Sequence, residues 1–320
     1  MGNEPLWAPA RQNLIDLLGA SLTLGVIAAG LSWLGAWYWR FELLANLRSP
    51  MALVLGVALG MFLALRAWRW SAVMSVGFAL AGGPVGAEAR SGGPSTVSGE
   101  PLRLYSANVL RNRYSTDATA AAILAVDPDV IVLLEVDDRW LRALAPSLVG
   151  WPHRVEAPRP DNFGVAVYSR VPFAGPPDPT GLAAMPPEVT VELLLPSGPA
   201  RLTATHPPPP VGAGYAKKRD EQLMALADRT AGCGRCVVAG DLNITPFSPA
   251  WRPFIEASGL LSSRGGRVMG TWPAGLPGPL MIPLDHILVG PEVGVESLVV
   301  GEKTGSDHHA LIAELVFPDG

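Results

Sequence analysis

Three long segments without a charged residue constrain the first part of the chain most strongly. They run from Leu17 to Trp39, from Ser49 to Leu65 and from Trp70 to Ala87. At roughly 1.5 Å per residue the first helix would cross a hydrocarbon core of about 30 Å, and the other two lie at the lower limit of length. Buried core helices are the alternative, and the third segment could also be signal-peptide-like. We predict a membrane anchor of two to three transmembrane helices over residues 1–81.

The loops between these segments carry conflicting signals of orientation. Arg66 and Arg69 lie in a very short loop, which favours a cytoplasmic loop and places the rest of the chain outside the cytoplasm. Arg40 and Arg48 in the preceding loop favour the opposite orientation. The overall composition, 49% apolar and 16% charged with a mean hydropathy of +0.27, is too apolar for an ordinary soluble enzyme. We expect the remaining chain to lie outside the cytoplasm.

Residues 82–100 are rich in Gly, Ser and Pro and predict a flexible tether. Strand-like and helix-like segments then alternate irregularly through residues 101–320. Strands are predicted at 102–108, 130–136, 164–169, 189–195, 200–206, 235–240, 284–289, 295–300 and 310–317, and helices at 118–126, 140–148 and 217–231. Hairpins without strict βαβ alternation favour an α/β domain of two packed mixed sheets with helices outside.

Charge and cysteine content bound the function. From Glu100 onward, 18 Lys and Arg face 24 Asp and Glu, which disfavours long nucleic acid as the main substrate because such proteins usually carry a basic footprint. Cys233 and Cys236 form a C-x-x-C without a second pair or a nearby histidine. A local disulfide in an oxidising compartment and two free thiols are both compatible with this spacing.

Polar side chains recur where predicted strands end. They are hard oxygen ligands and imidazoles, a set that suits a divalent cation and attack of water on a phosphate ester. No single one is specific, but the ordered set is. Its members are Asn108, Glu135, His206, Asp241, Asn243, Asp285, Asp307 and His308.

Glu135 follows five apolar residues of a strand expected to be buried on both faces. A carboxylate there is costly unless it binds a cation or hydrogen-bond donors, although a surface acid at the strand exit remains an alternative. Asn108 could donate to a phosphate oxygen, coordinate a metal through its amide oxygen, or simply form a turn. Both residues are therefore candidates for a metal site.

Asp241 and Asn243 flank Leu242 and would project the same way from an extended backbone. One could orient or deprotonate a water while the other holds a phosphate oxygen; an Asx turn is the structural alternative. His206 precedes four prolines and could donate to a phosphate oxygen or protonate a leaving group, or could be a surface histidine.

Asp285 and His308 could form a general-base pair, in which the carboxylate holds the imidazole in one tautomer. We expect antiparallel neighbouring strands to bring them together. Asp307 would point to the opposite side from His308 and could reach the metal. His286 and His309 are then expected to stand outside the chemistry, but spacing alone does not choose between His308 and His309.

Together these residues resemble the endonuclease/exonuclease/phosphatase superfamily of metal-dependent phosphoesterases. The resemblance spans Leu102 to Val316. Its further marks are the segment GVAVYSR at 164–170, Arg219 with Gln222, and the G-S-D-H of 305–308. It implies a four-layer α/β sandwich with the site at the ends of the central strands.

The resemblance also implies roles. Glu135 would bind Mg²⁺ or Mn²⁺ with help from Asn108 and Asp307. Asp241 and His308, which is oriented by Asp285, would prepare the attacking water. His206 and Asn243 would stabilise the charge on the phosphate. A histidine at 206 is similar to the deoxyribonuclease and sphingomyelinase branches, whereas the abasic-site enzymes use a tyrosine there. The anchor, the tether and the segment GTWP at 270–273 resemble a bacterial membrane-bound branch proposed to act on lipid-linked phosphates.

The sequence hypothesis is therefore a phosphoesterase anchored in a bacterial inner membrane, with its catalytic domain periplasmic or extracellular. Its substrate would be a phosphorylated small molecule or a lipid-linked phosphate. The apolar loop from Trp272 to Pro283 is a candidate contact for a lipid, and a rigid surface loop with a buried tryptophan is the alternative. An extracytoplasmic nuclease is the first alternative. An inactive membrane protein that binds ligand and retains the fold is the second.

Overall fold

The computed structural model describes residues 8–319 except 96, 179–180, 183 and 185. The chain divides into two compact units. The first comprises Met1–Arg90 together with Phe247–Pro249, and the second comprises Ser91–Pro246 and Ala250–Gly320. The first unit is helical and the second carries all the described strands, so each is considered separately.

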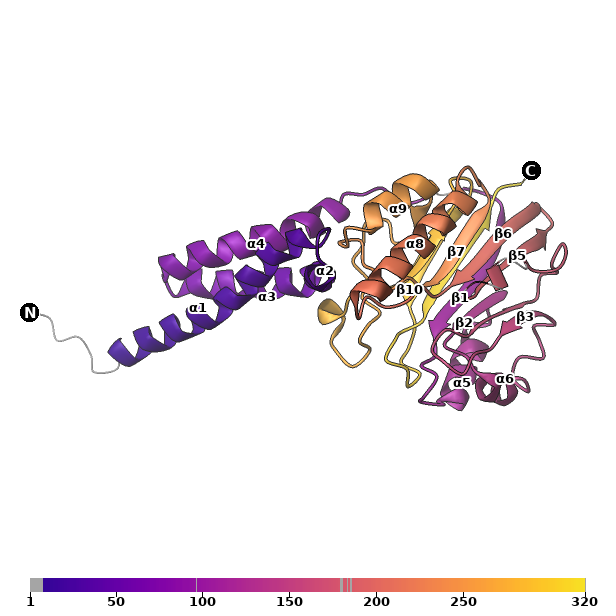
Figure 1. The fold of residues 1–320 in the computed structure, drawn as a ribbon, viewed down its shortest axis with the longest axis horizontal. Helices are drawn as coiled ribbons and strands as arrows, with labels where there is room; N and C mark the ends of the chain where they lie inside the picture. Colours follow the sequence, from indigo (N-terminus) through magenta and orange to yellow (C-terminus); the bar gives the residue numbers. More distant parts are fainter. Residues whose placement is uncertain (1–7, 96, 179–180, 183, 185, 320) are drawn as a thin grey trace, which may run out of the picture. The chain divides into compact units, whose positions relative to one another are not determined.

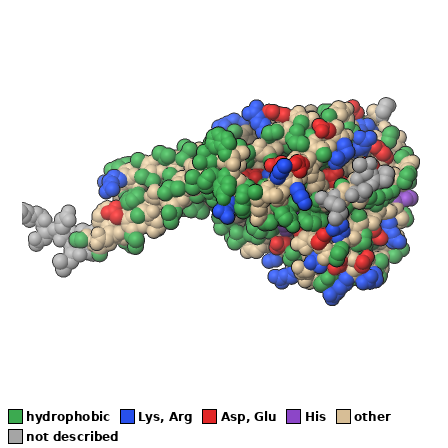
Figure 2. All heavy atoms as spheres, viewed as in Figure 1, with side chains coloured by type: hydrophobic (Ala, Val, Ile, Leu, Met, Phe, Trp, Pro, Cys, Tyr) green, Lys and Arg blue, Asp and Glu red, His purple; other side chains and the backbone are tan. Residues whose placement is uncertain are grey.

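The first unit consists of α1 (Ala8–Leu31), the short 3₁₀ turn η1 (Ser32–Leu34), α2 (Trp39–Asn46), α3 (Arg48–Ala64) and α4 (Trp68–Glu88). Hydrophobic side chains cover its visible surface between a few charged ones (Figure 2). Leu24 is 70% exposed and Val57 is 67% exposed. Exposure of a large apolar surface of this kind to water would be unfavourable. Two helices, Pro9–Leu34 and Trp68–Glu88, are long and apolar enough to cross a membrane; the pair α2 and α3, bent by 60°, would make a third.

The predicted tether is wrong in its first third, because Gly82 to Glu88 forms the last turns of α4. Pro84 has no backbone N–H and so leaves the carbonyl of Leu80 without its helical donor. The indole Nε1 of Trp33 donates to that carbonyl at 3.1 Å. Tertiary packing therefore compensates the break that Gly-Gly-Pro would cause in an isolated segment.

The second unit contains two mixed sheets (Figure 1). The six-stranded sheet has the order β10 (Gly294–Val300), β11 (Leu311–Phe317), β1 (Glu100–Asn108), β2 (Val130–Leu134), β4 (Val165–Ser169) and β3 (His153–Ala157). The five-stranded sheet has the order β5 (Glu188–Leu195), β6 (Gly198–Thr205), β7 (Cys236–Asp241), β9 (Asp285–Val289) and β8 (Leu261–Ser262). β1 is parallel to β2, and β6 is parallel to β7; the other pairs are antiparallel.

Three hydrophobic clusters show that the domain has four layers. The largest lies between the sheets and joins residues such as Leu104 and Val132 to Val191 and Ile287. A second cluster packs α5 (Thr116–Val126) and α6 (Asp138–Leu144) on the outer face of the six-stranded sheet. A third packs α8 (Ala213–Thr230) and α9 (Trp251–Ser258) on the outer face of the five-stranded sheet, as Figure 1 also shows. The predicted sandwich is confirmed, while β3, β8 and α9 were not predicted.

Gly240 lets β7 approach the end of β6. Its φ is +155°, and a Cβ at this position would lie 1.9 Å from the carbonyl oxygen of Thr205. No other residue fits without moving one of two central strands. The glycine of the Gly-Asp-Leu-Asn motif is therefore needed for packing beside His206 and Asp241.

We expect Gly240→Ala to destabilise the fold by at least about 2 kcal/mol, since overpacking and an unfavourable φ both oppose the methyl group. Gly150→Ala is the matched control because a Cβ there meets nothing within 4 Å. Chemical unfolding of the full-length chain in detergent measures both variants. Equal stability of the two would contradict the close approach.

Candidate active site

The polar residues singled out from the sequence occupy corresponding strand ends in the two sheets. Parallel pairing places the carboxyl ends of β1 and β2 together, and those of β6 and β7 together. Asn108 and Asp241 are the last residues of β1 and β7, Glu135 and His206 immediately follow β2 and β6, Asp285 begins β9, and His308 lies three residues before β11. All six are buried, with at most 7% of each residue exposed.

Asn108 connects the two sheets at the site. Its amide Nδ2 donates to Glu135 Oε1 at 3.0 Å and to Asp241 Oδ2 at 3.2 Å. Its Oδ1 accepts a hydrogen bond from the backbone N–H of Leu110 at 3.1 Å. Asn108 therefore forms the turn considered above, and it also bridges two carboxylates, which the sequence did not predict.

His206 lies between the same two carboxylates. Its Nε2 is 3.7 Å from Glu135 Oε1, and its Nδ1 is 3.7 Å from Asp241 Oδ2 and 3.1 Å from the carbonyl oxygen of Asp241. The ring is 2% exposed, so the alternative of a surface histidine is wrong. Burial alone would lower the pKa of His206, but the hydrogen bond with Glu135 and the charge of Asp241 raise it above its ordinary value.

Asp285 and His308 form the expected pair. His308 Nδ1 lies 2.9 Å from Asp285 Oδ2, and Nε2 lies 3.6 Å from Asp241 Oδ2. The expectation that neighbouring antiparallel strands join them is wrong, because β9 and β11 belong to different sheets. The contact forms across the sandwich, where the ends of the two sheets meet.

The segment after β7 is not extended. Asn243 has a φ of +53°, its backbone N–H donates to Asp241 Oδ1 at 3.0 Å, and its amide donates to the carbonyl of Pro207 at 2.9 Å. The Asx turn is therefore formed and the period-two argument fails here. Buried Arg219 donates to the carbonyl of Asn243 at 3.4 Å and helps to hold this turn.

Asp307 is held by the tryptophan loop. Trp272 Nε1 donates to Asp307 Oδ2 at 3.1 Å, and the N–H of Ala274 donates to the Asp307 carbonyl at 2.7 Å. The other carboxylate oxygen, Oδ1, is buried without a hydrogen-bond donor among the described residues. The Trp272 ring also lies 6.5 Å from the His308 ring, so this loop borders the site.

Backbone strain concentrates at the same place. Glu135 has a φ of +62°, in a region that costs a residue with a Cβ about 1 kcal/mol or more. The hydrogen bonds to Asn108 Nδ2 and to the backbone N–H of Arg111, the latter at 3.4 Å, hold its carboxylate in position. Strain at a buried acid is typical of a site in which placement of the carboxylate matters more than local stability.

The clustered charges shift the protonation of the acids. Burial opposes ionisation of Glu135, yet contacts with His206 and Asn108 hold its pKa below its ordinary value. Burial raises the pKa of Asp241 despite the opposing charge of His308. The pKa of Asp285 is lowered instead, because the charge of His308 and the hydrogen bond with it outweigh the effect of burial. His308 itself is desolvated, but the charges of Asp285 and Asp241 raise its pKa to about 10.

His286 and Arg264 form a support that the sequence did not reveal. His286 Nε2 lies 2.9 Å from the Ile244 carbonyl and Nδ1 lies 3.1 Å from Arg264 Nη1, while Arg264 also donates to the carbonyl of Asp285. Burial and the arginine charge lower the pKa of His286 to about 3. His286 is therefore neutral, and its hydrogen bonds connect the segments that carry Asn243 and Asp285. His309 bonds to the carbonyl of Gly301, away from this network.

The donor set fits a hard divalent cation. One oxygen or nitrogen from each of Asp241, Asp285 and His308 lie within 4.8 Å of one another, and Glu135 reaches this group through Asn108 and His206. The unpartnered oxygen of Asp307 is a further hard donor. Carboxylate and amide oxygens are the ligands that Mg²⁺ and Mn²⁺ prefer. Which of these residues bind the ion stays a prediction.

The family model described as the endonuclease/exonuclease/phosphatase family matches residues 97–308, more than half of the chain. This protein belongs to the endonuclease/exonuclease/phosphatase family. No curated protein sequence matches the chain.

Solved structures share the fold at low sequence identity. An endonuclease/exonuclease/phosphatase from Beutenbergia cavernae is similar with a TM-score of 0.55 and 22% identity, covering 68% of this chain and 72% of the other. A humanized TDP2 of D. rerio gives 0.54 and 16%, covering 67% and 98%. The human Nocturnin catalytic domain with bound sulfate gives 0.53 and 20%, covering 68% and 93%. At these identities the likeness establishes the fold alone.

The His308 environment predicts a loss of stability at alkaline pH in EDTA. The folded state keeps the His308 proton up to about pH 10, whereas an unfolded histidine releases it at about pH 6.5. This contribution is therefore complete below pH 6.5 and is lost as pH rises from 6.5 to 10. The thermal midpoint should fall over this range, and His308→Gln should flatten the fall. His309→Gln is the control. If the thermal midpoint of both variants falls with pH as steeply as that of the wild type, the charge network is contradicted.

Proposed function

We propose that this protein is a membrane-anchored, divalent-metal-dependent phosphoesterase that hydrolyses a phosphate ester or pyrophosphate by attack of water. The observation that carries the proposal is the convergence of Asn108, His206 and His308 on one oxygen of Asp241, between the two sheets. Membership of a family of phosphate-ester hydrolases supports the reaction class. Buried carboxylates beside two imidazoles supply both an acid–base pair and hard ligands.

The chain's own residues divide the work as follows. Asp285 accepts from Nδ1 of His308 and so directs Nε2 toward Asp241 and the attacking water. Because its pKa is about 10, His308 becomes a base only when the surrounding carboxylate charge is offset. We expect His206 and Asn243 to donate to phosphate oxygens as charge develops. A bound Mg²⁺ or Mn²⁺, held by Glu135 with Asn108 and Asp307, would supply Lewis-acid stabilisation of that charge.

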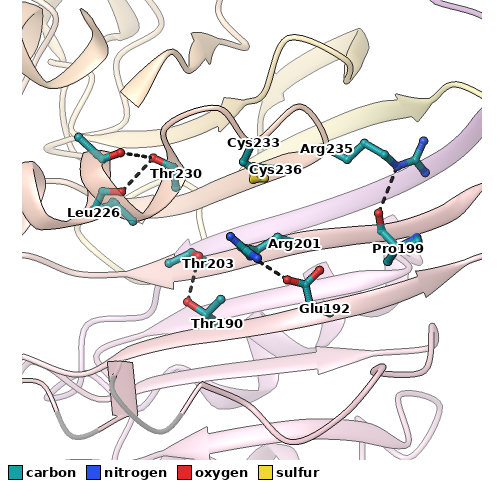
Figure 3. Close-up of a disulfide and its surroundings, with 11 residues drawn as sticks. Thr190, Glu192, Pro199, Arg201, Thr203, Leu226, Thr230, Cys233, Arg235 and Cys236 are labelled. Carbon is teal, nitrogen blue, oxygen red and sulfur yellow. Dashed lines mark hydrogen bonds and ion pairs between the residues drawn. A yellow bond between two sulfur atoms is a disulfide. The ribbon is translucent and has the colours of Figure 1, made fainter. Parts of the chain in front are cut away.

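We place the catalytic domain outside the cytoplasm of a bacterial inner membrane. The apolar helices Pro9–Leu34 and Trp68–Glu88 support an anchor. Cys233 and Cys236 form a disulfide between α8 and β7, next to the strand pair that carries Arg201 and Glu192 (Figure 3). Disulfides persist mainly in oxidising compartments, so the pairing favours the periplasm or cell exterior.

A small or lipid-linked phosphate is the substrate that the charge favours. The chain from Glu100 onward has six more acidic than basic residues, whereas duplex-binding proteins need cations along the backbone. Leu276 in the loop that begins at Trp272 is 45% exposed and offers apolar contact at the border of the site. A nuclease is the second candidate, since a D. rerio TDP2 of similar fold has been solved in complex with a single-strand DNA product.

A hydrolysis screen with Mg²⁺, in which the products of each substrate are separated and quantified, tests this proposal. Polyprenyl pyrophosphate, phospholipid, nucleotide and DNA should be compared, and one of the first two should give the highest kcat/KM. Glu135→Gln should lower that value by about a thousandfold, because it removes the charge expected to bind the cation. Far-ultraviolet circular dichroism controls for folding. Preferred cleavage of DNA would select the nuclease, and unchanged turnover in Glu135→Gln would refute the metal assignment.

The two adjacent histidines provide a second test. His308→Ala should lower kcat by about a hundredfold to ten-thousandfold, the usual range for a general base. His309→Ala should leave kcat within about threefold, because its ring contacts the Gly301 carbonyl and not the carboxylate network. Equal losses in the two variants would show that the wrong imidazole was assigned.

A further inference from the structure

The loop after β1 presents an arginine at the border of the site that the proposed reaction does not use. The backbone of Arg111 is fixed on both sides: its N–H donates to Glu135 Oε2 at 3.4 Å, and its carbonyl accepts from Trp140 Nε1 at 3.1 Å. The preceding residue, Leu110, has a φ of +56° and is held by Asn108 Oδ1. The side chain of Arg111 therefore starts from a point fixed by two site residues.

The guanidinium extends to a second loop that also borders the site. Arg111 Nε donates to Asn162 Oδ1 at 3.3 Å. The next residue, Phe163, lies with its ring 5.7 Å from the ring of His206. Arg111 and Asn162 thus join the segments beside Glu135 and His206, which the proposed function assigns to the cation and to a phosphate oxygen.

The positive charge of Arg111 remains available. Among the described residues its guanidinium forms no ion pair, in contrast to Arg103, Arg159 and Arg170. Its terminal nitrogens have no hydrogen-bond partner in the described part of the chain. The acid whose pKa it influences, Asp137, is engaged by the hydroxyl of Tyr114 and the N–H of Trp140. A guanidinium with its Nε fixed and two terminal donors open is suited to bind phosphate oxygens in a bidentate manner.

We propose that Arg111, positioned by Asn162, binds a second phosphoryl group of the substrate next to the one that is hydrolysed. This inference rests on the proposed phosphoesterase function and narrows its substrate to molecules that carry at least two phosphates. The second phosphate can belong to a pyrophosphate ester or to the neighbouring nucleotide of an oligonucleotide. Arg111 then determines specificity and takes no part in the chemical step.

A binding experiment tests this without turnover. Calorimetry on the full-length chain in detergent compares methylenediphosphonate, which carries two phosphorus groups, with methylphosphonate, which carries one. Arg111→Gln should weaken binding of the diphosphonate by about tenfold to a hundredfold, as expected for a charged hydrogen bond, and binding of methylphosphonate by less than about threefold. Arg111→Lys should restore part of the loss. Arg113→Gln removes one positive charge from an exposed residue of the same loop, and this variant should bind both phosphonates as the wild type does.

Kinetics then separate this inference from the proposed function. Arg111→Gln should raise KM for the substrate that carries the second phosphate, either farnesyl pyrophosphate or a short oligonucleotide. The kcat for that substrate, and the hydrolysis of bis-p-nitrophenyl phosphate, should stay near wild type. Equal weakening of both phosphonates, or equal effects of Arg111→Gln and Arg113→Gln, would overturn the subsite. An inert wild-type enzyme that still shows the expected phosphonate difference would refute the hydrolase and retain the subsite.

Discussion

One carboxylate organises the site. Asp241 Oδ2 lies 3.2 Å from the Asn108 amide, 3.6 Å from His308 and 3.7 Å from His206, so residues from both sheets depend on its position. β7 carries this acid and occupies the middle of the five-stranded sheet, between β6 and β9. Since Gly240 allows β7 to approach the Thr205 carbonyl closely, packing in the strand core decides where the charge is placed.

The site carries costs that its surroundings offset. Glu135 and Asn243 have positive φ values, and several acids are buried in mutual contact. Two parts of the site are supported by residues outside the predicted metal-binding and catalytic set. Arg219 bonds to the Asn243 carbonyl, and the Arg264–His286 pair ties Asp285 to Ile244. The rigidity of this support keeps charged groups close enough to alter one another's pKa.

Much of the site could be predicted because its members follow apolar strands. Glu135 after 130–134 and Asp241 after the short buried strand are visible as charges where the hydrophobic pattern stops. Arg264 and Arg111 gave no such signal, because each lies in a loop and acts through contacts with residues far along the chain. The pairing of Asp285 with His308 was expected for the wrong reason, since a sequence does not show that two strand ends meet across a sandwich.

The local pattern of apolar and polar residues alone determined most of the elements. Continuous apolar runs specified central strands such as β2 and β7, long uncharged segments specified the apolar helices, and acids at strand ends marked the candidate site. Tertiary contacts decided the extension of α4 through Pro84, the turn at Asn243 and the high pKa of His308. These three features depend on distances between groups that are remote in sequence. Burial and electrostatic energy are set by those distances, so the tertiary structure alone decides them.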